Sequence, residues 1–172
     1  VQSMLARSAA GFLSNKYDTE VKIKTFYIKP DLRIHAEEVQ INDKKHNPMF
    51  YVGKLDGKVS LRDITTELRV KSINIDDVLI NIMKYEDEYL TNIAEMFASD
   101  DEKTDKTKSK IYLDELNLSK GHFVLWDQNK DKPEKKSMDH AHLDIDSINI
   151  SARSLSFDGK VVKGYLAMLS GM

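Results

Sequence analysis

Cysteine is absent from this sequence, and its 172 residues include only three prolines and seven glycines. Without cysteine the chain has no disulfide, no thiol nucleophile and no thiolate ligand for zinc. The sequence also has no glycine-rich phosphate loop, no Gly-x-Ser-x-Gly and no His-Glu-x-x-His. Because these common catalytic motifs are missing, we predict that the protein is not an enzyme and uses no cofactor.

An excess of charge of one sign is missing as well, since 26 Lys and Arg residues accompany 28 Asp and Glu residues. Nucleic-acid binding needs a clear basic excess, so no nucleic acid is predicted as a partner. No apolar run approaches the roughly 18–20 residues that span a bilayer, and no signal peptide is recognisable. Because the chain starts at Val1 and ends just after an apolar run, we expect it to be a segment of a longer protein.

Hydrophobic periodicity predicts a single, mainly β domain of the α+β type over residues 1–172. The period divides the chain into a helix (1–15), a first sheet section (17–83), a second short helix (87–98), a mobile charged loop (99–110) and a second sheet section (111–172). Val1, Leu5, Ala9 and Phe12 form the apolar stripe of the first helix. Its serines and Gly11 lower its helix propensity, so we expect this amphipathic helix to lie against another element.

Three stretches share one pattern, in which an acidic break separates two short strands. They cover residues 72–83, 110–119 and 143–150, and the first break is Asp76-Asp77. The hydrophobic phase also slips at Glu37-Glu38, which predicts a β-bulge there. Degenerate repeats of this kind predict an extended, curved antiparallel sheet that grows by addition of strands and has open edges.

Several predicted strands carry large apolar side chains at both odd and even positions. In residues 21–28, for example, Val21 and Ile23 alternate with a set that includes Phe26 and Ile28. Either the two helices cover a second apolar face of the sheet, or the sheet forms an elongated trough for acyl chains. Buried core is the commoner fate of apolar faces, so the residues alone favour the first interpretation.

The residues that could bind metal or act as acid and base form no complete site. His140 and His142 have the spacing that places two imidazoles on one side of a strand, with Asp144 on the same side. They are only weak candidates, because further ligands are unassigned and a solvated strand start explains them equally, so no metal is predicted. Adjacent acids such as Asp76 and Asp77 point to opposite faces of a strand and cannot act on one atom.

The order of these elements resembles the N-terminal part of the AsmA/TamB family of Gram-negative envelope proteins, especially the large TamB-like proteins of Bacteroidetes. The resemblance covers most of the chain. It is carried by the opening helix that ends Phe12-Leu13-Ser14, by the strand 16–23, by the strand 32–43 that ends in Asp43, and by the segments 51–61 and 71–82. The long loop at 42–49 and the scarcity of glycine depart from the family pattern.

The resemblance implies a periplasmic protein, anchored in the inner membrane by a helix upstream of this segment. It implies a long, taco-like β structure with an apolar interior, no catalytic residues, and phospholipid as the ligand. We therefore expect an envelope-biogenesis protein that shields or conducts phospholipid acyl chains between the two membranes. The candidates for contact with lipid are Ile23, Ile80, Ile82, Leu125, Val162 and Leu166.

The alternative function is also one that the resemblance implies. TamB acts with an outer-membrane partner, TamA, in the assembly of outer-membrane proteins. In that case this segment would be an assembly scaffold, and its open sheet edge would pair with a strand of a client protein. Lipid would touch the side-chain face of the sheet, whereas a client would touch the backbone of the edge strand.

Overall fold

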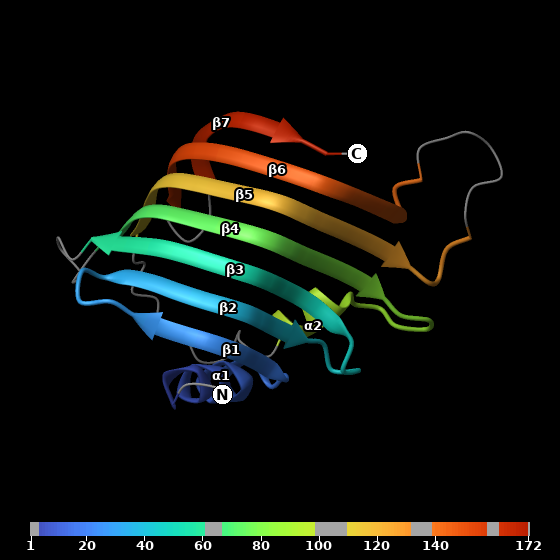
Figure 1. Cartoon of the computed structure of the whole chain (residues 1–172). Coiled ribbons are helices and arrows are strands. Elements are labelled where there is room, and N and C mark those ends of the chain that lie inside the picture. Colours follow the sequence, from blue (N-terminus) through green and yellow to red (C-terminus); the bar gives the residue numbers. More distant parts are fainter. Residues whose placement is uncertain (1–3, 61–66, 99–109, 132–138, 158–161, 172) are drawn as a thin grey trace.

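Seven strands form one open sheet in the order β1 to β7, so each strand lies beside its neighbours in the sequence (Figure 1). This computed structural model describes residues 4–60, 67–98, 110–131, 139–157 and 162–171. The strands are β1 (Val21–Ile28), β2 (Arg33–Asn42), β3 (Pro48–Ser60), β4 (Glu67–Lys84), β5 (Lys110–Asp127), β6 (His142–Phe157) and β7 (Val162–Ser170), and the helices are α1 (Met4–Tyr17) and α2 (Asn92–Ala98). The predicted mainly β fold with two helices is confirmed.

The sheet is mixed, because one pair of neighbouring strands is parallel. All other neighbours pair antiparallel, whereas β4 and β5 run in the same direction, with Glu67 opposite Lys110. Parallel neighbours need a crossover connection, and residues 85–109, which include α2, provide one. The prediction of a wholly antiparallel sheet is therefore wrong at this pair. The predicted mobile loop at 99–110 lies outside the described residues except for Lys110, which begins β5.

β4, β5 and β6 each continue through the position where the sequence predicts a break. Five residues within the strands have a left-handed backbone. The fifth, Ser154 (φ 54°), lies further along β6, whereas four lie near one level of the sheet: Glu38 (φ 48°), Asp77 (φ 60°), Lys120 (φ 53°) and Ser147 (φ 56°). We call these four residues the left-handed row, because the strand pairing brings them together across the sheet. A left-handed non-glycine residue costs about 1–2 kcal/mol, so the surrounding pairing must hold each one in place.

The strands on either side of the left-handed row remain in register. Glu37 pairs with Lys54 and Val39 pairs with Val52, so Glu38 lies opposite Gly53 without any shift. The predicted bulge at Glu37-Glu38 is therefore absent from the β2–β3 ladder. In the same way, the pairs on both sides of Asp77 place it opposite Gly53 of β3 and beside Lys120 of β5. The β2–β3, β3–β4 and β4–β5 ladders cross this level without a shift, whereas the β5–β6 register shifts on both sides of Gly121.

The side chains change faces at the left-handed row. A Cβ atom on Gly121 would lie 2.8 Å from Cδ2 of Leu118 and 3.1 Å from Cβ of Ile148, so positions 118 and 121 face the same side. Strict alternation would place residues three apart on opposite sides. In β1, likewise, Phe26 packs against the cluster that contains Val21 and Ile23. Val21, Ile23 and Phe26 therefore lie on one side of the sheet although their parity differs, whereas Tyr27 lies on the other side, where it stacks on His35.

Helix α1 packs its small side chains against the first two strands. Ala6 and Ala10 are buried with Val21 and Ile23, and Val39 and Ile41 of β2 lie against the same cluster. The expected contact between this helix and another element is therefore present. The predicted stripe is confirmed at Ala9, which packs against this cluster, and wrong at Leu5 and Phe12, which are 56% and 68% exposed. Val1 lies outside the described residues. Alanines allow the helix to approach the sheet more closely than leucine or phenylalanine would.

Buried polar groups attach α2 and the β2–β3 loop to the end of β4. Oδ1 of Asn92 accepts a hydrogen bond from the backbone N–H of Met83 at 3.0 Å, and its amide nitrogen donates to the carbonyl oxygen of Asn81 at 3.0 Å. The Tyr85 hydroxyl donates to Asp43 in the loop and accepts from Asn47 at 2.8 Å. Burial and the Asp43 carboxylate raise the pKa of Tyr85 to about 12. These bonds explain why the helix begins at Asn92 rather than at residue 87.

Candidate functional site

One side of the sheet carries a continuous set of large apolar residues across three adjacent strands. The register places Ile75 beside Leu118 and Ile82 beside Leu125, and β6 continues both rows. We call this set the apolar face; its members are Ile73, Ile75, Val78, Ile80, Ile82, Leu116, Leu118, Phe123, Leu125, Leu143, Ile145, Ile148 and Ile150. Figure 1 shows that the sheet bends strongly along its strands and that α2 lies behind it.

The apolar face is not buried by the described part of the chain. Of its residues only Val78 is buried, at 8% exposure, and the others remain partly exposed, Ile145 the most at 36%. The two helices do not close it, because α1 packs mainly on β1 and α2 packs on β4. Apolar surface in water costs about 25 cal/mol per Å², and soluble proteins rarely leave a large contiguous patch open. This face is therefore the strongest candidate for a binding surface in the described residues.

The structure brings three of the six candidate lipid-contact residues together. Ile80, Ile82 and Leu125 lie on the apolar face, where Ile82 and Leu125 are direct neighbours. Ile23 lies elsewhere, because it is only 4% exposed in the core beneath α1.

The other two candidates belong to the edge strand. Leu166 is 61% exposed on β7, opposite Ala152. Val162 pairs with Phe157 at the start of β7, and its side chain lies outside the described residues.

Sequence reasoning missed most of the apolar face. Leu118, Phe123 and Ile148 were not among the candidates, although Phe123 is the direct partner of the candidate Ile80. The signal that could have found them is the break that recurs in the repeats, because a change of face at each break places both parities on one side. In β5, however, the left-handed residue is Lys120, well after the predicted break at Asp114-Glu115.

The opposite side of the sheet carries a compact charged cluster centred on His35. Nδ1 of His35 lies 2.6 Å from Oδ1 of Asp56, and Nε2 lies 3.1 Å from Oε1 of Glu37. The imidazole also stacks on Tyr27, with 4.7 Å between ring centroids. The Asp56 carboxylate raises the pKa of His35, and the His35 ring lowers the pKa of Asp56. Both ring nitrogens are thus engaged by carboxylates, and the cluster is an ion-pair network.

The weak metal candidates form hydrogen bonds within the protein. Nδ1 of His142 lies 2.8 Å from Asp139, and its Nε2 lies 2.9 Å from the carbonyl oxygen of Asp127. His140 lies before β6, which begins at His142, so the two residues do not share a strand as expected. Asp144 is bonded instead to Nε2 of His122 at 2.7 Å. Within the described ranges, no group of three or more histidine, aspartate or glutamate residues could hold a metal ion.

Comparison of the chain with protein-family models and with curated proteins finds no match. Neither helix of the described residues is long and apolar enough to cross a membrane. The class of protein that the fold defines is therefore an open, mixed β-sheet protein with one uncovered apolar face.

Proposed function

We propose that the apolar face holds the acyl chains of phospholipids. The observation that supports this proposal is that large apolar residues of β4, β5 and β6 are direct partners across the sheet and remain partly exposed to solvent. Each methylene moved from water onto such a surface gains about 0.8 kcal/mol, and a lipid chain has many of them. The interaction needs no nucleotide, metal or catalytic group.

The dimensions of the sheet suit a lipid chain. β4 and β5 have 18 residues each. At about 3.3 Å per residue a strand of this size extends for roughly 60 Å, which exceeds the hydrocarbon thickness of a bilayer, about 30 Å. An acyl chain could therefore lie along the apolar face over its whole length and leave space for movement along the strands.

The resemblance to the AsmA/TamB family supports the cellular setting of this proposal. In that setting the chain is a periplasmic, membrane-proximal segment of an envelope-biogenesis protein, anchored to the inner membrane of a Gram-negative bacterium. It shields or conducts phospholipid toward the outer membrane.

Site-specific photocrosslinking in the full-length protein tests the lipid proposal in cells. A photoreactive residue at Ile80, Ile82 or Leu125 should capture labelled phospholipid. The matched control is Val124, which is adjacent to Leu125, is similarly exposed and faces the other side of the sheet. Capture at Val124 as strongly as at Leu125, or capture of protein alone at all positions, would contradict the proposal.

A second candidate function is a scaffold that pairs with a client strand through β7. The supporting observation is that β7 is the last strand of the sheet, paired among the described strands with β6 alone, and carries large exposed side chains, Tyr165 at 76% and Leu169 at 63%. Ala167 lies where the β6–β7 register shifts, so Ala167→Pro removes a backbone N–H with little damage to β6. This variant should abolish client capture and spare lipid capture, whereas Ile82→Asp should do the reverse.

A further inference from the structure

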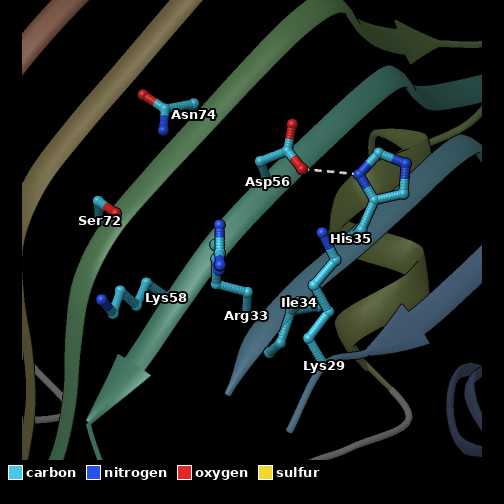
Figure 2. Close-up of a pocket in the computed structure, with 9 residues that line it drawn as sticks. Lys29, Arg33, Ile34, His35, Asp56, Lys58, Ser72 and Asn74 are labelled. Atoms are coloured by element: carbon cyan, nitrogen blue, oxygen red, sulfur yellow. Dashed lines mark hydrogen bonds and ion pairs between the residues drawn. The ribbon is translucent and has the colours of Figure 1, made fainter. Parts of the chain in front are cut away.

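Three cationic side chains surround a hollow of about 450 Å³ on the polar side of the sheet (Figure 2). Lys29 comes from the start of the β1–β2 connection, Arg33 from β2 and Lys58 from β3, and Ser72 and Asn74 of β4 line the same hollow. We call these five residues the basic hollow. In Figure 2 the polar side chains project in front of the strands while α2 lies behind them. The basic hollow is thus on the side opposite the apolar face.

The strand register forces two of the cations together. Arg33 is the direct partner of Lys58, and Lys58 is in turn the direct partner of Ser72. Like charges directly opposite each other on neighbouring strands are destabilising. A backbone hydrogen bond of 2.8 Å from Lys29 to the carbonyl oxygen of Arg33 holds the third cation beside this pair. An anion that bridges these groups would remove the repulsion.

The acids of this region neutralise only part of the positive charge. Oδ2 of Asp31 lies 2.6 Å from Nε of Arg33, which leaves the other guanidinium N–H groups as donors. Asp56 and His35 also line the hollow, and the Asp56 carboxylate is engaged by His35 at 2.6 Å and by Lys54 at 3.1 Å.

Neither Lys29 nor Lys58 forms an ion pair with another residue of the described ranges. The ammonium of Lys29 lies 5.8 Å from the centroid of the Tyr27 ring, a contact that leaves its charge unneutralised. The basic hollow therefore presents two ammonium groups and most of a guanidinium without an anionic partner.

Two neutral groups on β4 complete the set of donors. The hydroxyl of Ser72 can donate one hydrogen bond. Oδ1 of Asn74 already accepts from the amide nitrogen of Asn117 at 3.1 Å, so the amide nitrogen of Asn74 remains available as a donor. A planar guanidinium, two ammonium groups and two neutral donors match a tetrahedral oxyanion that has several acceptor oxygens.

We propose that the basic hollow binds a phosphate group. The group belongs either to a soluble phosphate or to the headgroup of a phospholipid, since both present the same oxygens. This site uses residues outside the apolar face, so it stands whether or not that face holds acyl chains.

Titration with inorganic phosphate at low salt tests the site. Phosphate should raise the melting temperature of the wild type and shift the NMR signals of Arg33, Lys58 and Ser72. In the variant Arg33→Gln/Lys58→Gln the affinity should fall by about tenfold or more, since hydrogen bonds to charged groups are lost. Without phosphate this variant should melt no lower than the wild type, because the opposed charges are gone.

A variant that removes equal charge elsewhere is the control. Lys16→Gln/Lys163→Gln changes an α1 and a β7 residue and should keep the phosphate affinity within about twofold. An equal loss in both double variants would mean diffuse attraction and would overturn the proposal, as would unchanged affinity in Arg33→Gln/Lys58→Gln. The single variant Lys29→Gln, at an exposed loop position, should weaken binding without any risk to the sheet.

Vesicle binding distinguishes the two sources of phosphate. The background variant Ile82→Asp/Leu125→Asp removes the contribution of the apolar face. Co-sedimentation with vesicles that contain phosphatidic acid, lost when Arg33→Gln/Lys58→Gln is added, identifies a lipid headgroup. Phosphate binding without such co-sedimentation identifies a soluble phosphate, and the absence of both overturns the proposal.

Discussion

His35 shows how a polar side chain can be held on the open side of a sheet. Its side chain is 12% exposed, because it lies between Tyr27 and Asp56 on neighbouring strands. A buried imidazolium without partners would be expelled or neutralised. Here Asp56 and Glu37 supply the opposite charge, and they favour the protonated ring.

The pH dependence of stability should report this ion pair. The raised pKa of His35 means that its contribution is complete below the ordinary value of about 6.5 and is lost as pH rises through the folded-state pKa. The lowered pKa of Asp56 means that its contribution is present above its ordinary value, about 3.8, and is lost as pH falls through the folded-state pKa. The pair therefore stabilises most between these two ranges.

Asp56→Asn should flatten the fall in the free energy of unfolding that accompanies a rise in pH above about 6.5, as measured by urea denaturation. Glu37→Gln added to it should flatten the fall further. The control is Asp114→Asn, which removes an exposed carboxylate bound to Arg69 at 3.3 Å and should leave the slope unchanged. Identical slopes in the wild type and in Asp56→Asn would contradict this assignment.

At the scale of elements, the amino-acid composition of α1 does not indicate which side of the helix packs against the sheet. The buried residues of α1 are alanines, and Leu13 packs partly buried against the same cluster, whereas Met4, Leu5 and Phe12 are exposed. Close approach of helix to sheet, rather than the amount of apolar surface, decides which side is buried. Packing at native density leaves no space for a larger side chain at these positions.

Ala6→Leu should therefore destabilise the protein, by about 1–3 kcal/mol, because Ala6 is 0% exposed between α1 and β1. Leu5→Ala, on the neighbouring but exposed position, should change the free energy of unfolding by less than about 0.5 kcal/mol. Chemical denaturation of both variants measures the difference. If Ala6→Leu were neutral and Leu5→Ala costly, α1 would pack through its other side.

At the scale of the whole molecule, the sheet has more apolar surface than its two helices cover. The main buried cluster consists of Ala6, Ala10, Val21 and Ile23, at one edge of the sheet. Most of the apolar face lies outside it, so the central strands lack the usual stabilisation from burial on one side. A ligand that covers this face should contribute to folding as well as be bound.

Melting temperature should therefore rise when a short-chain phospholipid is added as a monomer. A ligand at a hundred times its Kd adds about 2.7 kcal/mol of stability if it binds only the folded state. Ile82→Asp/Leu125→Asp should abolish the rise, whereas the face-reversed control Val124→Asp should retain it. Scanning calorimetry measures all three proteins, and a rise that survives in the first variant would contradict lipid binding at the apolar face.

The sequence allowed the strand-rich fold to be predicted because alternation survives in short stretches, such as Val78, Ile80 and Ile82. It did not reveal that the strands continue through the breaks. Asp76-Asp77 is equally compatible with a strand end and with one left-handed residue, since both need a short polar side chain. The parallel pairing of β4 and β5 could not be predicted either, because the sequence between the two strands is equally compatible with a connection between antiparallel strands.

The candidate surface was only partly predictable for the same reason. Strict alternation within each strand predicted Ile80, Ile82 and Leu125 as surface candidates. Leu118 and Ile148 lie on the same side of the sheet only because the side chains change faces at the left-handed row. The basic hollow depends on three cations that are distant in sequence from their β4 neighbours. Only the register, which places Lys58 opposite both Arg33 and Ser72, brings them together.

The left-handed row also limits how this chain can evolve by insertion and deletion. Loss of Asp77 alone would restore regular alternation within β4, but it would put half of that strand one residue out of step with β3 and β5. Only matching losses in every strand would keep both the hydrogen-bonded ladders and the common apolar side. We therefore expect descendants of this sequence to keep the extra residue in all these strands or to lose it from all of them together.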